Sequence, residues 1–122
     1  MVRRLSIVPI MFNGWYVNNV KVDKAFQGST VTARFIKSSG IEGAYKIRIR
    51  RHIFSLWTND QVVAEVSFQF GGKPVNQDIS FSPDFCTNDA GTKGYYAELL
   101  KDGYVIWEMV KTYPPRLKVF RP

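Results

Sequence analysis

The chain of 122 residues is 45% hydrophobic and 22% charged, a composition that excludes an intrinsically disordered chain and fits one domain with a single core. Its formal net charge is +7, and the excess lies in residues 1–61, which carry ten Lys and Arg against three acids. A single cysteine, Cys86, excludes an internal disulfide and a zinc site of paired thiols, and no apolar run approaches the ~20 residues that span a bilayer, so we expect a soluble chain.

Residues 5–12 form an apolar run that Pro9 interrupts. We predict a strand here rather than a signal peptide, because Pro9 breaks the run and the residues after it make a poor cleavage site. Proline donates no ladder hydrogen bond, which confines the segment to a sheet edge or a lid. The run is apolar on both faces, so its own sheet or a neighbouring subunit must cover it, and we favour its own sheet. We therefore divide the chain into an N-terminal strand or arm, 1–14, and one domain, 15–122.

Most of the remaining chain consists of short segments that alternate apolar and polar residues at a period of two, which is typical of strands with one buried face. Three dipeptides that predict turns separate some of them: Asn13-Gly14, Gln27-Gly28 and Asp102-Gly103. The expected strands cover residues 5–12, 15–22, 29–37, 43–51, 62–70, 78–81, 95–100, 104–110 and 117–120. No long window has apolar residues at helical spacing. The sequence thus predicts an all-β fold, an antiparallel β-sandwich of about seven to nine strands with an extra N-terminal strand or arm.

Residues 43–51 are the one expected strand with a basic stripe, because three apolar side chains alternate with three cations. We predict a central strand whose apolar face is buried. The apolar residues are Tyr45, Ile47 and Ile49, and the cations are Lys46, Arg48 and Arg50.

Two interpretations of this stripe stay open. In the first, the three cations and Arg51 bind an anionic polymer, nucleic acid or acidic glycan, beside the rings of Phe54 and Trp57. In the second, Glu98 and Glu108 on neighbouring strands neutralise the cations, through exposed pairs worth ~0.2–1 kcal/mol each. We favour neutralisation.

The segment 89–98, with Gly94-Tyr95-Tyr96 at its centre, resembles the corner that leads into strand F of immunoglobulin-like domains. In that family a tyrosine at the start of strand F bonds back to the preceding backbone. The chain has no B–F cysteine pair, since Ala33 stands on strand B, and Ile47 stands where antibody domains carry a core tryptophan, so it is more similar to fibronectin-type and other cysteine-free sandwiches. The resemblance implies strands A, B, C and E at 15–22, 29–37, 43–51 and 62–70, followed by an F–G hairpin.

Nothing in the sequence places the single histidine, His52, beside the thiol of Cys86. A catalytic pair of the two therefore competes with an ordinary surface histidine and a structural cysteine, which we favour. Asp84 and Asp89 fit turns better than a calcium loop. The glycine-rich nucleotide-binding motifs and the hydrolase nucleophile motif do not occur. We expect no enzymatic activity, no cofactor and no metal.

The first functional hypothesis is a non-enzymatic module that makes protein–protein contacts, as a subunit or decorating domain of a filament, capsid or surface layer. The second is a binder of anionic polymers that uses Lys46, Arg48, Arg50 and Arg51, and the third is a sugar-binding module. The compartment and the oligomeric state stay open, and a virion or cell-surface assembly fits the first hypothesis. The residues expected to bind a protein partner are Leu5, Ile7, Val8, Ile10, Phe12, Phe54 and Trp57, with the loop 82–94.

Overall fold

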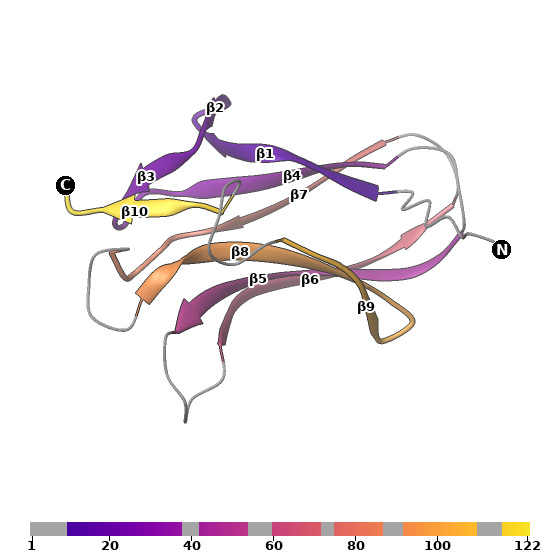
Figure 1. The fold of residues 1–122 in the computed structure, drawn as a ribbon. Coiled ribbons are helices and arrows are strands. Elements are labelled where there is room, and N and C mark those ends of the chain that lie inside the picture. Colours follow the sequence, from indigo (N-terminus) through magenta and orange to yellow (C-terminus); the bar gives the residue numbers. More distant parts are fainter. Residues whose placement is uncertain (1–9, 38–41, 54–59, 72–74, 87–91, 110–115) are drawn as a thin grey trace, which may run out of the picture.

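The computed structural model describes residues 10–37, 42–53, 60–71, 75–86, 92–109 and 116–122, and every regular element in these ranges is a strand (Figure 1). None of these residues belongs to a helix that could cross a membrane. The predicted all-β class is confirmed. The strands are β1 (Ile10–Val17), β2 (Val20–Val22), β3 (Lys24–Phe26), β4 (Val31–Lys37), β5 (Gly43–Ile53), β6 (Gln61–Phe70), β7 (Val75–Phe81), β8 (Thr92–Lys101), β9 (Tyr104–Glu108) and β10 (Lys118–Phe120).

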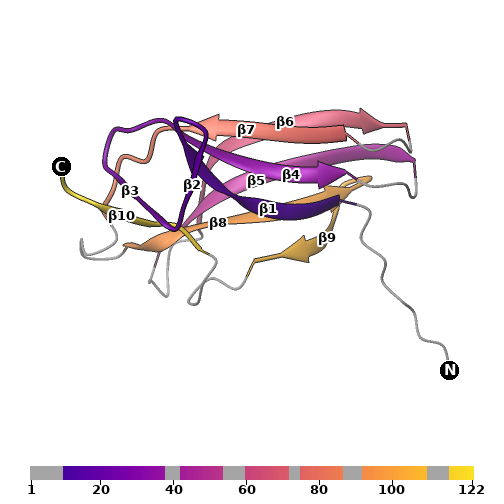
Figure 2. The same cartoon turned by 90° about the horizontal axis from the view of Figure 1, so that it is seen from above.

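Eight of the strands form two antiparallel sheets, of order β2-β1-β4-β7 and β6-β5-β8-β9. The sheets lie one above the other and do not close into a barrel (Figure 1). Seen from above, the strands of the two layers run along nearly the same direction, as in aligned sheet packing (Figure 2).

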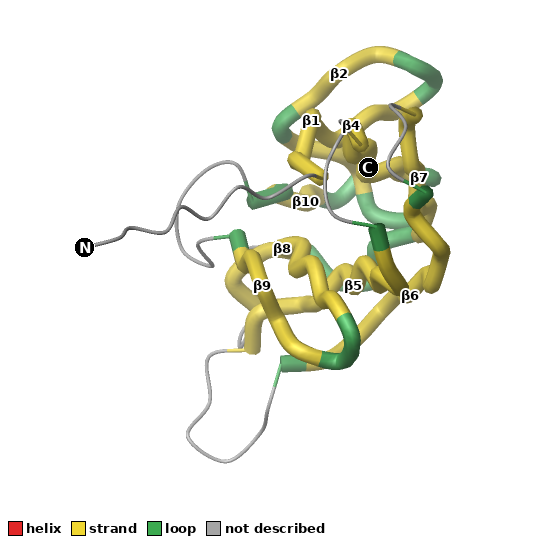
Figure 3. Tube along the Cα trace, turned by 90° about the vertical axis from the view of Figure 1, so that its right-hand side faces the viewer, coloured by secondary structure: helices red, strands yellow, loops and turns green. Residues whose placement is uncertain are grey.

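The remaining strands, β3 and β10, form a small parallel pair that the sequence did not predict. Viewed end-on, β10 lies between the two layers (Figure 3). The residue before β10, Leu117, makes an isolated bridge to Tyr95 of β8, with backbone bonds of 2.8 and 3.0 Å. The C-terminal segment therefore connects β3 to β8, one of the two central strands of the β6-β5-β8-β9 sheet.

The core lies between the sheets, where alternate residues of the central strands are buried. Period-two alternation is confirmed on β4 and on β5, whose even-numbered cations point away from the core. Trp15 is also buried, whereas Trp107 is only half-buried. The buried residues of β4 and β5 that the alternation predicts are Val31, Ala33, Phe35, Tyr45, Ile47 and Ile49.

The turn predicted at Asn13-Gly14 is wrong, because β1 runs through both residues and pairs with β4 on either side of them. The register shifts between Phe12 and Gly14, which is a β-bulge, and a Cβ at position 14 would lie 2.7 Å from the Cε of Lys21. The chain turns instead at Asn18 and Asn19, whose φ angles of 51° and 65° suit asparagine in a two-residue hairpin loop.

The first described residues do not form a separate arm. Ile10 is buried in the core, and the ring of Phe12 lies 5.1 Å from Trp15 and 5.4 Å from Phe35. These two residues of the expected partner-binding set therefore pack inside their own domain, and β1 continues across the expected boundary between 14 and 15. The other members of that set, Leu5, Ile7, Val8, Phe54 and Trp57, lie outside the described residues.

The hairpin predicted at Asp102-Gly103 is confirmed, with φ angles of 51° and 88° at the two loop residues. The strand predicted at 62–70 is also confirmed, but it pairs with β5 rather than with β4. The neighbour of β4 is β7, which begins three residues earlier than the predicted 78–81.

Candidate functional site

The outer face of the β6-β5-β8-β9 sheet carries the basic stripe that the sequence predicts. Lys46, Arg48 and Arg50 project from β5 on the face opposite the buried Tyr45, Ile47 and Ile49. The register then places acids beside them, because Arg48 lies opposite Glu65 on β6 and opposite Glu98 on β8.

Each of the three cations makes an ion pair on this face. Glu65 lies 2.9 Å from Arg48 Nε and 3.8 Å from Lys46 Nζ. Glu98 Oε1 lies 3.4 Å from both Arg48 Nη1 and Arg50 Nη1. The predicted neutralisation by Glu98 is confirmed, whereas Glu65 was missed although it stands on the polar face of a predicted strand.

Glu108, the second predicted partner, lies opposite Glu98 across β8 and β9, and among the described residues no ion pair joins it to a cation. Two like charges at directly opposed positions destabilise a sheet. The side chain of Glu98 is only 1% exposed, and its second oxygen, Oε2, has no hydrogen-bond partner in the described structure. The charged face thus contains a buried carboxylate that two arginines hold from one side.

A second group of polar contacts, around Asp60, adjoins the ion pair of Glu98 and Arg50. Asp60, the residue before β6, accepts a 2.6 Å hydrogen bond from the hydroxyl of Tyr96 and a 3.0 Å bond from the backbone N–H of Ile53. Arg50 Nη2 also donates to its carbonyl oxygen at 2.8 Å. Burial, and then the bond to Asp60, raise the pKa of Tyr96 far above its usual value, so the phenol stays protonated and donates.

The structure separates Arg51 from the other three cations. Its guanidinium donates to Gln61 Oε1 at 2.9 and 3.1 Å and lies 3.8 Å above the ring of Phe85. The four predicted anion-binding residues therefore do not form one cluster.

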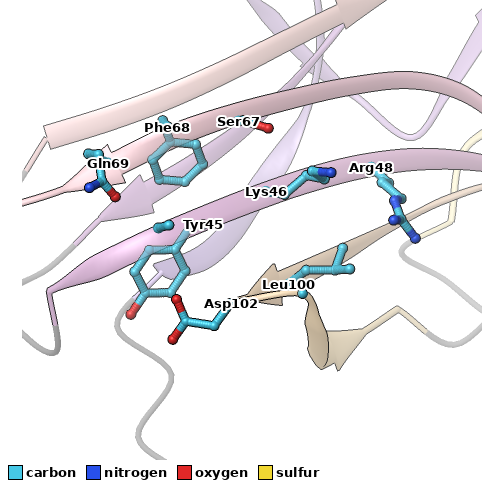
Figure 4. Close-up of a pocket in the computed structure, with 10 residues that line it drawn as sticks. Tyr45, Lys46, Arg48, Ser67, Phe68, Gln69, Leu100 and Asp102 are labelled. Carbon is cyan, nitrogen blue, oxygen red and sulfur yellow. The ribbon is translucent and has the colours of Figure 1, made fainter.

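A shallow hollow of about 400 Å³ lies at the end of the charged face (Figure 4). Its walls combine Lys46 and Arg48 with the apolar side chain of Leu100 and the amide of Gln69. Since both cations already pair with glutamates, the free positive charge that the hollow offers to a ligand is small.

His52 and Cys86, the two residues considered as a catalytic pair, lie in different environments. His52 is half-buried at the end of β5, and Cys86 is buried with its Sγ 3.6 Å from Gln27 Oε1. Among the residues that the structure describes, no three His, Cys, Asp or Glu side chains gather to hold a metal ion. Asp84 is exposed in the segment after β7, and Asp89 lies outside the described residues.

Two surfaces that sequence reasoning missed stand out. One is β9, where Tyr104, Val105 and Ile106 are all exposed. The other is a hollow between the β2–β3 segment and β10. The sequence predicts the strand of the first surface, but not that its apolar side chains are exposed. The second surface depends on a parallel pairing between segments about 90 residues apart, which no local sequence pattern indicates.

No protein-family model matches the chain, and no curated protein matches it.

Proposed function

We propose that the chain is a non-enzymatic interaction module that joins a protein assembly through β9, with a second copy of the chain as the partner. The proposal rests on one observation: three consecutive large side chains of this edge strand are exposed. Tyr104 is 76% exposed, Val105 50% and Ile106 38%. Successive side chains of a strand point to opposite faces, so this exposed apolar surface lies on both sides of the sheet edge. Exposed large apolar side chains on a folded protein are typical of a protein contact.

The long edge strand of the other sheet, β7, is better protected than β9. On β7 the residues that face solvent are polar, among them Asn76, Asp78 and Ser80. β9 has only Glu108 as a charge at its end and a register shift against β8. Edge strands of monomeric proteins normally carry charges, prolines or bulges against association. We propose packing of side chains rather than a continuous ladder, because the bulge interrupts regular pairing.

Self-association through this patch should rise with protein concentration and with salt. Each copy carries +7, so salt screens the repulsion between copies while the apolar contact persists. Light scattering should show masses above the 14.0 kDa monomer at high protein concentration, and Val105→Lys should return the mass to that value. The control is Val62→Lys on the opposite edge, where the side chain is 43% exposed; it should leave association unchanged. A monomer mass at every concentration and salt level would contradict the proposal.

We propose further that the fold is immunoglobulin-like, of the cysteine-free kind. Strand order supports this, because β4 lies between β1 and β7 as strand B lies between A and E, and β5 pairs with β8 as C pairs with F. The strand at 62–70 cannot be E, since it pairs with β5, and β7 takes that place. The hydroxyl of Tyr95 bonds to the backbone of Phe85, with 3.1 Å to its N–H and 3.4 Å to its carbonyl, which is the contact that the resemblance implies.

Removing that hydroxyl should weaken the fold. Tyr95→Phe should lower the free energy of unfolding by about 1 to 2 kcal/mol, because the N–H of Phe85 loses its acceptor. Burial also raises the pKa of Tyr95, so the protonated hydroxyl persists into alkaline solution. Urea denaturation measures the difference. Tyr104→Phe is the control, since this exposed ring should change stability by less than about 0.5 kcal/mol. Equal effects at both positions would show that the hydrogen bond between Tyr95 and Phe85 does not stabilise the fold.

Anion binding by β5 receives less support. Glu65 and Glu98 pair with Lys46, Arg48 and Arg50, and Arg51 lies apart over Phe85. Pairing lowers the long-range attraction of this face for phosphate or sulfate groups.

A further inference from the structure

An open hollow of about 720 Å³ lies between the β2–β3 segment and β10. Val17, Val22 and Ala25 give it an apolar wall, and the rings of Phe26 and Phe120 border it. Phe26 is 60% exposed, so this large ring has much of its surface in water. The hollow therefore offers apolar surface to a ligand.

Cations surround this apolar surface. Lys21 and Lys24 line the hollow, and an adjoining hollow of about 240 Å³ shares Lys24 and Phe120 with it and adds Lys118. Asp23 is the one acid in both linings. The parallel register of β3 and β10 brings Lys24 and Lys118 to the same level, so two lysines stand side by side across the pair.

These lysines differ from the cations of β5 in their electrostatic partners. Within the described ranges, no ion pair involves Lys21, Lys24 or Lys118, whereas Lys46, Arg48 and Arg50 each contact a glutamate. All three lysines are exposed. Three exposed lysines without an ion pair in the described residues therefore lie around this hollow, whereas glutamates compensate Lys46, Arg48 and Arg50 on the stripe that the sequence singles out.

We propose that this groove docks an extended acidic peptide segment of another protein, with apolar side chains against Val22 and Phe26 and carboxylates beside Lys21, Lys24 and Lys118. Alternation of acidic and apolar residues suits the site, because successive side chains of an extended peptide point to opposite sides. The apolar wall favours a peptide over a nucleic acid, whose phosphates need a longer row of cations. The site is independent of the β9 contact.

An NMR titration of the ¹⁵N-labelled full chain tests the proposal. The probe is a peptide of about six alternating Leu and Glu residues, which spans roughly 20 Å when extended. Its ends are acetylated and amidated, so they carry no charge. The expected result is saturable shift changes at the amides of Ala25, Phe26 and Phe120, weakened by salt. The same peptide with Gln for Glu, and a peptide of Glu alone, should both bind more weakly.

Variants separate this groove from the other surfaces. The double variant Lys21→Glu, Lys24→Glu should weaken binding by about tenfold or more, and Phe26→Ser should also weaken it. Lys46→Glu, a single charge reversal on β5, should change the affinity by less than about twofold. Val105→Lys should retain binding, so that a failure of the β9 contact and a failure of this groove give different results.

Three outcomes would overturn the proposal. The first is the absence of shift changes around the groove at the highest peptide concentration. The second is unchanged affinity in the double lysine variant. The third is tighter binding of a single-stranded oligonucleotide than of the acidic peptide at the same residues, which would assign the groove to nucleic acid.

Discussion

Replacing Glu98 with alanine should lower the free energy of unfolding by about 2 to 4 kcal/mol. The side chain of Glu98 is 1% exposed, and its carboxylate lies 3.4 Å from both Arg48 and Arg50. Its removal therefore takes away a negative charge that balances the positive charges of the two guanidiniums. The value falls below the ~3–5 kcal/mol of a wholly buried pair, because both arginines keep about a quarter of their side chains in water and can be hydrated. Equilibrium unfolding in urea gives the difference directly.

Two further variants show whether charge or shape matters at this position. Glu65→Ala removes a glutamate that also contacts Arg48, at 2.9 Å, but is 41% exposed; it should cost less than about 1 kcal/mol. Glu98→Gln keeps an oxygen for the arginines and places an amide N–H₂ where Oε2 has no partner, so it should cost less than the alanine variant. If Glu98→Ala costs no more than Glu65→Ala, the carboxylate does not hold this face together.

The charged face shows what the sequence could predict. The alternation along 43–51 fixes which side chains of β5 enter the core, because a strand has a strict period of two. Glu98 follows as a partner once the strand at 95–100 is placed beside β5. Its burial does not follow, since it depends on where the side chains of Arg48 and Arg50 come to lie when they reach Glu98 from the neighbouring strand.

The errors have physical causes as well. Asn13-Gly14 is a strong turn signal, yet pairing with β4 on both sides of the dipeptide outweighs it, and the chain absorbs the difference as a bulge. The partner of β6 depends on which sheet edge is free, and alternation within a strand carries no such information. The groove beside β3 needs residues from both ends of the chain, so only the three-dimensional structure brings its lysines together.

Trp15→Ala should have the largest effect of all, a loss of about 3 to 5 kcal/mol in the free energy of unfolding. The indole is 1% exposed and contacts Phe12 at 5.1 Å and Phe81 at 5.9 Å between ring centroids. Phe81 lies 5.7 Å from Tyr95 on the facing sheet, so these rings form a chain of contacts across the core. Far-UV circular dichroism during guanidinium denaturation is the suitable measurement, because the substitution removes a fluorescent reporter.

Trp107→Ala is the matched control for Trp15→Ala, because it deletes the same side chain from a half-buried position on β9. Trp107 stacks on Phe12 at 6.3 Å and meets Phe35 edge-on at 6.1 Å, so it touches the same aromatic group from the edge of the other sheet. Its loss should cost roughly 1 to 3 kcal/mol, since part of the ring already contacts water in the folded state and a smaller cavity remains. If Trp107→Ala lowers the free energy of unfolding by as much as Trp15→Ala or more, the centre of the core lies beneath β9 instead. The side chains on the inner side of that strand would then be essential to the fold.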